Sequence, residues 1–481
     1  MTVLTGPFRP GGMALAATYI VTAALPLLLA HAQSAAPMGR WEYAAAALGM
    51  IVLWGMAVQF VTSGRFEALS GKLGIDKIMA FHKLAAMWLG LAVVLHPLVY
   101  ILPTWLDDPE LGWIRLRFYL TDPAYRSGVI SLAALLVLIG TSLLLDRLPW
   151  PYEAWRATHI VLGLVAVLAG LHHAWAVGRF SAEGALAWFW ALVALAVLGV
   201  VAVLYGWRWW LLHRRPWRLK SVTKRADRMW ELDIQPAHGT PQMPYHAGQF
   251  VWMTEGARRF PLFDHPFSIA DSPGRDGLSL LIKEAGDFTS QIGTLPEGRA
   301  IGIDGPYGEF TLEAHPADAL LLIGGGVGIA PVLGILRDMV ARGDKRPQRL
   351  AYAVGQPENF ACLDELRAAT ETLNLQLWLL SEQPPETPDM LQGRLTRDRL
   401  SEMLEGLPPD STRAFICGPG PMVVAVSDTL LDLGMPMSNV IYERFDYSGN
   451  ARSRLDRART GRMLSIGAAL LVIVTGFALS M

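Results

Sequence analysis

Seven apolar stretches limit what this sequence can fold into. Six of them lie in the first 213 residues, at 13–31, 42–62, 78–102, 127–146, 156–178 and 185–212, and a seventh closes the chain at 463–480. About 20 apolar residues in a helix span the hydrocarbon core of a bilayer, which is about 30 Å thick. The sequence therefore predicts a bundle of six transmembrane helices and one further transmembrane helix at the C-terminal end.

The positions of lysine and arginine predict how these helices are oriented. The sixth stretch ends in WRWWLLHRRPWRLK, and the seventh follows ARSRLDRARTGR. Basic residues are retained on the cytoplasmic side of a membrane protein. The connection 103–126 carries Asp107, Asp108 and Glu110 and is expected on the far side. We therefore expect a multi-pass protein of the inner (plasma) membrane, with its N-terminus and the long segment before the seventh helix in the cytoplasm.

That long segment, about 216–450, has the composition of a globular protein. It holds most of the acidic residues of a chain in which only 17% of residues are charged. The formal net charge of −1 provides no general attraction to nucleic acid. The only two cysteines, Cys362 and Cys417, exclude a disulfide scaffold and a cysteine-ligated iron–sulfur cluster, which needs about four thiolates.

Two of the predicted transmembrane helices carry histidines near both ends. HKLAAMWLGLAVVLH places His82 and His96 fourteen residues apart, and THIVLGLVAVLAGLHHAW contains His159, His172 and His173. Fourteen helical residues rise about 21 Å and complete nearly four turns, so the first two histidines share one face at two depths. Because both helices run in the same direction, each depth receives imidazoles from both of them.

Two facing imidazoles at each depth suit a haem with two axial histidines. Zinc is less favoured because it takes four ligands. For any single histidine, a hydrogen bond to a carbonyl of a neighbouring helix is the alternative. Ideal helical rotation from His159 favours His173 at the outer level, because thirteen residues leave His172 off the stripe. A local bulge would bring His172 into line.

The globular segment divides into two patterns. Short β-runs with Gly-Pro turns from about 217 to 312 predict a small antiparallel barrel. Strands and helices then alternate, which predicts an open parallel sheet that binds its ligand outside the carboxyl ends of the strands. The glycine-rich turn 324–328 would let backbone amides approach a pyrophosphate at a helix N-terminus, and CGPGPM at 417–422 is a second such turn. Either turn taken alone could be an ordinary loop.

Six short motifs follow one another along the globular segment: HPFS, GDFT, DGPYG, GGGVGIAP, CGPGP and ERF. Together they resemble the ferredoxin–NADP reductase type of flavoprotein module, as found in the NADPH oxidase and ferric reductase superfamily. The histidine helices resemble the haem helices of that superfamily. The resemblance covers about residues 40–447. It implies a six-helix domain with two stacked b-type haems at 1–213, an FAD-binding β-barrel at 216–312 and an α/β domain for NADPH or NADH at 317–447. A basic linker, 448–462, and the final helix, 463–481, would follow.

The resemblance assigns roles to single residues. His82 and His159 would hold the inner haem, and His96 and His172 the outer one, since the family's spacing on the fifth helix is thirteen residues. The flavin would contact His265, Pro266, Phe267, Ser268, Lys283, Gly286, Phe288 and Thr289. The nicotinamide dinucleotide would contact Gly324, Gly325, Gly326, Gly328, Pro331, Cys417, Gly418 and Pro419. Phe445 would cover the flavin face that nicotinamide must reach, and it must move for hydride transfer. Ser268 and Cys417 complete the predicted catalytic residues.

The implied function is electron transfer from NAD(P)H through FAD and two haems to an acceptor across the membrane. Oxygen, giving superoxide, is the first expected acceptor. The alternatives are ferric or cupric chelates and a periplasmic redox partner, and a membrane anchor without haem is a further rival.

Three departures from the family bear on this reading: the chain continues beyond Phe445, Tyr100 stands where oxidases often have another histidine, and Glu382 follows Ser381 where a Ser–Arg pair usually holds a 2′-phosphate. NADH is therefore open as the donor. The seventh stretch has no clean G-x-x-x-G, so it does not favour a homo-oligomer.

Overall fold

The structure, a computed structural model, describes residues 12–33, 38–63, 66, 75–408, 410–444 and 453–481. Contacts between residues divide the chain into two compact units. Of the described residues, the helical unit comprises those from Gly12 to Trp207 together with Gly461–Met481, and the sheet unit comprises those from Arg208 to Thr460.

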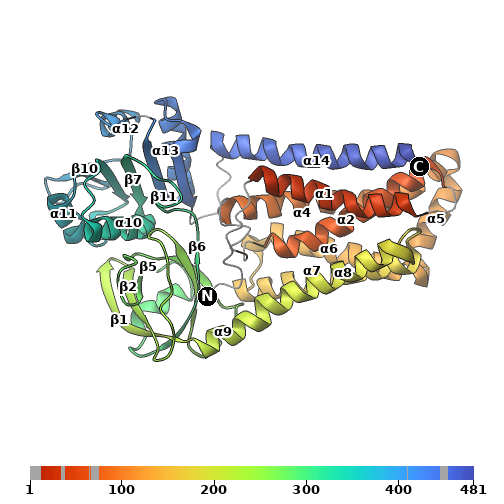
Figure 1. Ribbon diagram of the computed structural model, residues 1–481, viewed down its shortest axis with the longest axis horizontal. Coiled ribbons are helices and arrows are strands. Elements are labelled where there is room, and N and C mark those ends of the chain that lie inside the picture. The colour runs from red at the N-terminus through yellow and green to blue at the C-terminus, as the bar shows by residue number, and fades with distance from the viewer. Residues whose placement is uncertain (1–11, 34–37, 64–65, 67–74, 409, 445–452) are drawn as a thin grey trace. The chain divides into compact units, whose positions relative to one another are not determined.

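Among the described residues, seven helices are long and apolar enough to cross a membrane, which confirms the predicted fold class. They are α1 (Gly12–Ala32), α2 (Arg40–Val61), α4 (Ile75–Asp107), α6 (Arg126–Leu143), α7 (Tyr152–Val177), α8 (Gly184–Val201) and α14 (Arg454–Ser480). Helix α8 continues through a π-turn, η3 (Ala202–Trp207), into α9 (Arg208–Arg214). The membrane helices run alongside one another (Figure 1).

Helix α2 lies at the centre of the helical unit. Half of its apolar window is buried, against 17% to 22% for the other six helices. Small residues allow this close packing: a Cβ atom at Gly55 would lie only 2.5 Å from the Leu89 side chain of α4. Van der Waals contact of this kind drives helix association where lipid already solvates apolar side chains.

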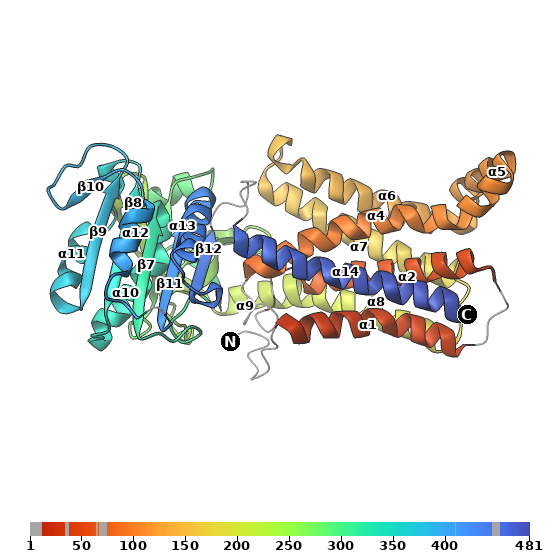
Figure 2. The same cartoon turned by 90° about the horizontal axis from the view of Figure 1, so that it is seen from above.

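A helix that the sequence analysis did not predict, α5 (Pro109–Thr121), lies within the connection 103–126. Asp108 caps its N-terminus by accepting hydrogen bonds from the amides of Glu110 and Leu111, and Pro109 occupies the first helical position. The helix lies at the end of the bundle where α4 ends, as both views show (Figures 1 and 2).

The seventh spanning helix, α14, belongs to the same packed core as the others. Its Phe477 side chain meets Tyr43 of α2 edge to face at 6.4 Å and Phe180 at 6.2 Å. The helix begins at Arg454 and therefore includes much of the segment expected as a linker. Its first turns, up to Thr460, count with the sheet unit.

The first part of the sheet unit is the expected antiparallel barrel. Its strands are β1 (Trp217–Ala226), β2 (Met229–Pro236), β3 (Phe250–Glu255), β4 (His265–Ser268), β5 (Leu278–Lys283) and β6 (Ala300–Tyr307). They pair in the order β4-β3-β6-β1-β2-β5. A bridge between Ile269 and Leu280 links the two ends of this order, so the sheet closes on itself.

The second part is the expected parallel sheet. Its strands are β7 (Ala319–Gly325), β8 (Gln348–Val354), β9 (Leu375–Ser381), β10 (Met390–Gln392), β11 (Thr412–Gly418) and β12 (Val440–Arg444), in the order β10-β9-β8-β7-β11-β12. Helices α10 (Ile329–Arg342) and α11 (Leu363–Thr372) pack on one face, and α12 (Arg397–Leu404) and α13 (Gly420–Asp432) on the other. Every residue of β7 is buried, as expected of a central strand covered on both faces.

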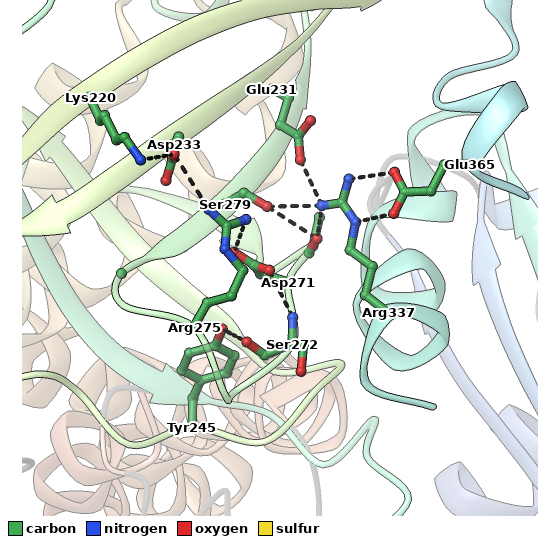
Figure 3. A network of polar contacts seen from close by, with 12 residues as sticks. Lys220, Glu231, Asp233, Tyr245, Asp271, Ser272, Arg275, Ser279, Arg337 and Glu365 are labelled. Carbon is green, nitrogen blue, oxygen red and sulfur yellow. Dashed lines mark hydrogen bonds and ion pairs between the residues drawn. The ribbon is translucent and has the colours of Figure 1, made fainter. Parts of the chain in front are cut away.

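One arginine joins the barrel to the parallel sheet. Arg337 of α10 donates to Glu231 of β2 at 2.6 Å, to the Ser279 hydroxyl of β5 at 3.0 Å and to the Ala270 carbonyl. Its other nitrogens hold Glu365 of α11 at 2.6 and 2.8 Å. Figure 3 shows the guanidinium lying between the two carboxylates. A single, mostly buried guanidinium thus contacts both halves of the sheet unit, in addition to the apolar side chains that they share.

Candidate functional site

The two glycine-rich turns lie side by side at the carboxyl edge of the parallel sheet. Strands β7 and β11 are neighbours, and Gly324 pairs with Cys417. A Cβ atom at Gly328 would lie 2.2 Å from the Cys417 carbonyl oxygen, and one at Gly325 would lie 2.7 Å from Met422. Only glycine permits this approach, so the sequence of the first turn is dictated by its contact with the second.

Both turns lead directly into helices. Helix α10 begins at Ile329 after the first turn, and α13 begins at Gly420 after the second, with Pro331 and Pro419 at these helix starts. Unpaired amides and the positive end of the dipole favour an anion at a helix N-terminus. Two such ends at one edge fit the pyrophosphate of a dinucleotide, which agrees with the predicted contacts.

The predicted flavin residues also come together. Strand β4 carries His265, Pro266, Phe267 and Ser268, and it pairs with β3. The His265 ring stacks on Phe288 with centroids 4.3 Å apart and planes within 11°. The Ser268 hydroxyl is buried and has no hydrogen-bond partner among the described residues. A buried hydroxyl without a partner, on the strand that also carries Phe267, fits a site completed by a polar ligand.

The GDFT turn is closed by its own threonine. Thr289 Oγ1 accepts hydrogen bonds from the amides of Ala285 at 2.8 Å and Gly286 at 2.9 Å. These contacts fix the turn just beyond Lys283, whose side chain is exposed at the end of β5. The structure therefore gives Thr289 a role in shaping the turn, and direct contact of Thr289 with FAD phosphates stays a prediction.

In the helical unit, His82 of α4 and His159 of α7 face one another. Their ring centroids lie 6.3 Å apart. A metal bonded at about 2 Å by one nitrogen of each ring fits between imidazoles at this separation. The Ser142 hydroxyl lies 3.2 Å from His159 Nδ1, while His82 Nδ1 is buried without a partner among the described residues.

The second histidine level opens into a cavity of about 500 Å³ within the helical unit. His96 of α4 and His173 of α7 both line it. His96 Nδ1 lies 2.8 Å from the Ala45 carbonyl and donates to it, which leaves Nε2 for a ligand. A Cβ atom at Gly49 would lie 2.6 Å from the His96 ring, and one at Gly128 would lie 2.7 Å from the His173 ring. These two glycines therefore make room for the imidazoles.

This arrangement favours His173 over the predicted His172 at the outer level, and the identity of the outer ligand stays a prediction. His172 is exposed, and its Nδ1 lies 3.0 Å from the Ser127 hydroxyl. Helix α7 runs unbroken from Tyr152 to Val177, so no bulge rotates His172 onto the stripe of His159. The ideal rotation of fourteen residues holds instead, and it brings His173 to the wall of the cavity that His96 also lines.

Polar side chains from α4 and α5 line the same cavity. Arg115 donates to the Thr104 hydroxyl at 2.6 Å and to Tyr119 at 3.2 Å, and it lies 3.6 Å from a Glu42 oxygen. Tyr100 meets the His96 ring edge to face at 5.6 Å. Sequence reasoning missed Arg115 because helix α5 was not predicted, although the Asp-Pro-Glu run that caps this helix was visible.

Two further observations bear on the predicted site. No group of three or more histidine, cysteine or acidic residues gathers around a metal position in the part of the chain that the structure describes. Phe445 lies outside the described residues, so its predicted role is untested. The residue before it, Arg444, pairs with Gly418 at the end of β11.

Comparison with known proteins identifies three regions. A ferric reductase like transmembrane component matches residues 48–170, an FAD-binding domain matches 218–311 and an oxidoreductase NAD-binding domain matches 322–428. The first region contains His82, His96 and His159.

Curated relatives match about half of this chain. The flavohemoprotein of Bacillus subtilis (strain 168) is 23% identical over 53% of this chain and 66% of its own length. The reductase component of propane 2-monooxygenase from Rhodococcus jostii (strain RHA1) is 30% identical over 49% of this chain and 63% of its own length. The chain thus spans just under two thirds of these relatives. A solved ferredoxin NADP+ reductase from Neisseria gonorrhoeae with bound FAD and NADP is 22% identical, with 48% of this chain and 97% of that chain covered at a TM-score of 0.42.

The spanning helices, the closed barrel and the parallel sheet with its glycine-rich edge define a multi-pass membrane oxidoreductase that binds FAD and NAD(P)H. The order of the three matched regions is the architecture of one family. In this order, the three regions form the architecture of the NADPH oxidase and ferric reductase superfamily, as the sequence motifs predicted.

Proposed function

We propose that this protein carries electrons from cytoplasmic NAD(P)H across the membrane, with FAD and two b-type haems as its bound redox groups. The observation that carries the proposal is the pair of histidine levels on α4 and α7, within the region similar to a ferric reductase transmembrane component. A flavin exchanges two electrons with a nicotinamide and single electrons with other groups, and a haem iron carries one electron.

The chain's own residues support two haem positions. His82 and His159 would hold the inner haem, and His96 and His173 the outer one. Hydrogen bonds orient the imidazoles: the Ala45 carbonyl accepts from His96 Nδ1, and the Ser142 hydroxyl lies beside His159 Nδ1. Fixing Nδ1 in this way directs Nε2 toward a metal and sets the ring orientation.

In the barrel, the proposed task of the residues is to bind and shield the flavin. Phe267 and Phe288 offer apolar ring surface, and the orphaned Ser268 hydroxyl would supply a hydrogen bond near the reactive edge. At the parallel sheet, the two glycine-rich turns would bind the dinucleotide backbone, and Cys417 would lie at the nicotinamide end. Phe445 is proposed, from its family role, to gate access to the flavin.

Orientation follows from the basic ends of the membrane helices. The arginines of α9 and of the first turns of α14 favour the cytoplasm for the sheet unit. We therefore place the protein in the inner membrane, with NAD(P)H oxidation inside and the His96 level outside.

Oxygen is the proposed acceptor, and superoxide the product. Ferric or cupric chelate reduction is the second candidate, and Arg115 and Arg179 at the outer cavity favour it because many chelates are anions. Delivery of electrons to a periplasmic redox partner is the third. Oligomeric assembly forms no part of the proposal.

The test uses purified full-length protein loaded with haem and FAD in lipid nanodiscs. We expect b-type haem absorption, and reduction of that band by NADH or NADPH without oxygen. Absence of a b-type band from protein that retains FAD would refute the path and favour a membrane anchor without haem. Superoxide production against ferric citrate reduction then separates the first two acceptors, and reduced haems that pass electrons to neither would favour a protein partner.

A further inference from the structure

The sheet topology shows which strands meet each half of a bound dinucleotide. A dinucleotide lies across the carboxyl ends of the strands with its pyrophosphate at the turn after β7. The barrel adjoins the β12 side of this edge: a Cβ atom at Gly308, just after β6, would lie 3.5 Å from Glu443 of β12. The nicotinamide half must point toward the barrel, so the adenosine half lies over the ends of β8 and β9.

The segment after β9 is held firmly at this position. The Glu382 amide donates to the Val354 carbonyl of β8 at 3.1 Å, and the Gln383 amide donates to the Gly355 carbonyl at 3.2 Å. The Ser381 carbonyl accepts from the Gly393 amide at 2.7 Å, which joins the loop after β10 to the same edge. Glu382 therefore presents its carboxylate at a fixed point of the adenosine end.

One cation approaches this carboxylate directly. Arg394 Nε, from the loop after β10, donates to Glu382 Oε1 at 2.6 Å. This hydrogen bond lowers the pKa of Glu382 from its usual value, so the carboxylate is charged near neutral pH. Arg399 lies beside the loop, but its guanidinium is bound to the Arg394 and Gln392 carbonyls at 2.7 and 2.8 Å.

We propose that Glu382 makes this site select NADH over NADPH. Its carboxylate accepts hydrogen bonds from the ribose hydroxyls of adenosine, repels a 2′-phosphate and holds the Arg394 guanidinium away from one. An acidic residue at the end of a strand is the general solution for recognising a ribose 2′-hydroxyl, and arginine is the solution for a 2′-phosphate. Here both residues are present, and the Glu382 carboxylate accepts a hydrogen bond from Arg394, which keeps the guanidinium from a 2′-phosphate. The inference rests on the proposed function, because it names the electron donor of that site.

Three variants separate the parts of this proposal. Glu382→Gln removes the repelling charge and releases Arg394, so affinity for a 2′-phosphate should rise at least about tenfold, as the removal of a unit charge at contact distance near a protein surface requires. Arg394→Gln leaves Glu382 in place and should bring no such gain. The double variant should lose the gain of Glu382→Gln. Glu386→Gln, an exposed glutamate of the same loop, is the matched control and should change nothing.

The probes are ADP and 2′,5′-ADP, titrated calorimetrically into full-length protein loaded with FAD. They carry no nicotinamide, so the binding ratio is measured without turnover. We expect the unmodified protein to prefer ADP and Glu382→Gln to shift the ratio toward 2′,5′-ADP. A preference for 2′,5′-ADP in the unmodified protein, or a ratio unchanged within twofold in Glu382→Gln, overturns the inference.

A different result would show that the proposed function is wrong while the donor preference is correct. In that case ADP binds with the expected preference, but neither NADH nor NADPH reduces a haem. As a kinetic check, flavin-dependent ferricyanide reduction should favour NADH in the unmodified protein, and the preference should fall in Glu382→Gln but not in Glu386→Gln.

Discussion

Replacing Arg337 with methionine tests how the barrel and the parallel sheet are held together. The side chain is only 14% exposed, and its partner Glu231 is 7% exposed. Removing one member of a buried ion pair costs about 3–5 kcal/mol, because the other charge remains buried. Arg225 still contacts Glu231, which points to the lower end of this range. The contact with Glu365, which is 41% exposed, adds little.

We therefore expect Arg337→Met to destabilise the sheet unit by about 3 kcal/mol. In a domain of this size, 1 kcal/mol shifts the melting temperature by about 2–4 °C, so the shift should be about 6–12 °C. Release of FAD fluorescence during heating of the full-length protein measures it. Arg342→Met is the matched control, because Arg342 lies on the same helix with an exposed side chain paired to Asp338.

The same variant has a defined pH dependence. Burial raises the pKa of Glu231, but the guanidiniums of Arg337 and Arg225 outweigh it and hold this pKa below its usual value. The unfolded state then binds the proton more readily, so the stabilisation is complete above the ordinary carboxyl pKa and is lost as pH falls through the lowered one. In Arg337→Met, burial raises the pKa of Glu231 with less opposition, because only Arg225 then lowers it. The loss of stability in acid should therefore be smaller in this variant.

One result would refute this reasoning. If Arg337→Met melts within 2 °C of Arg342→Met, the network contributes nothing measurable. The apolar cluster shared by both halves, in which Met229 and Leu281 of the barrel pack with Leu333 and Leu336 of α10, would then hold the interface alone.

Three further predictions concern the helical unit and its connection to the sheet unit. His173→Leu should remove the outer haem and leave the inner one, whereas His172→Leu should retain both; pyridine haemochrome assay of each variant decides between them, and the reverse pattern would restore the family assignment. Gly49→Val should displace the imidazole beside it and lower haem content toward one per chain, while Gly140→Val, where a side chain meets open space, should not. Asp456→Asn should weaken the base of α14 by about 1–3 kcal/mol, because the carboxylate accepts charged and neutral hydrogen bonds. Unchanged hydrogen exchange at the start of α14 would contradict the prediction.

Local sequence patterns are enough to predict most of the fold of this protein. Apolar length is enough to predict the spanning helices, because each such helix satisfies its own backbone hydrogen bonds. The change from short β-runs to alternating strand and helix predicts an antiparallel barrel followed by a parallel sheet. The fourteen-residue spacing of His82 and His96 predicts two levels, since helical rotation depends only on residue number. Helix α5 itself was not predicted, because its charged and aromatic sequence lacks the apolar length that marked the membrane helices.

Tertiary structure decided the points at which distant residues meet. It placed His173, and not His172, at the wall of the cavity beside His96, because α7 is unbroken and no bulge rotates the helix. It joined Glu382 to Arg394 through two loops whose separation in space the sequence does not encode locally. Periodicity is a property of one segment, whereas a hydrogen bond between two loops depends on how every strand between them is paired. The chain's sequence alone therefore determined its class and the depths of its membrane histidines, and the folded structure determined which side chains face one another at each depth.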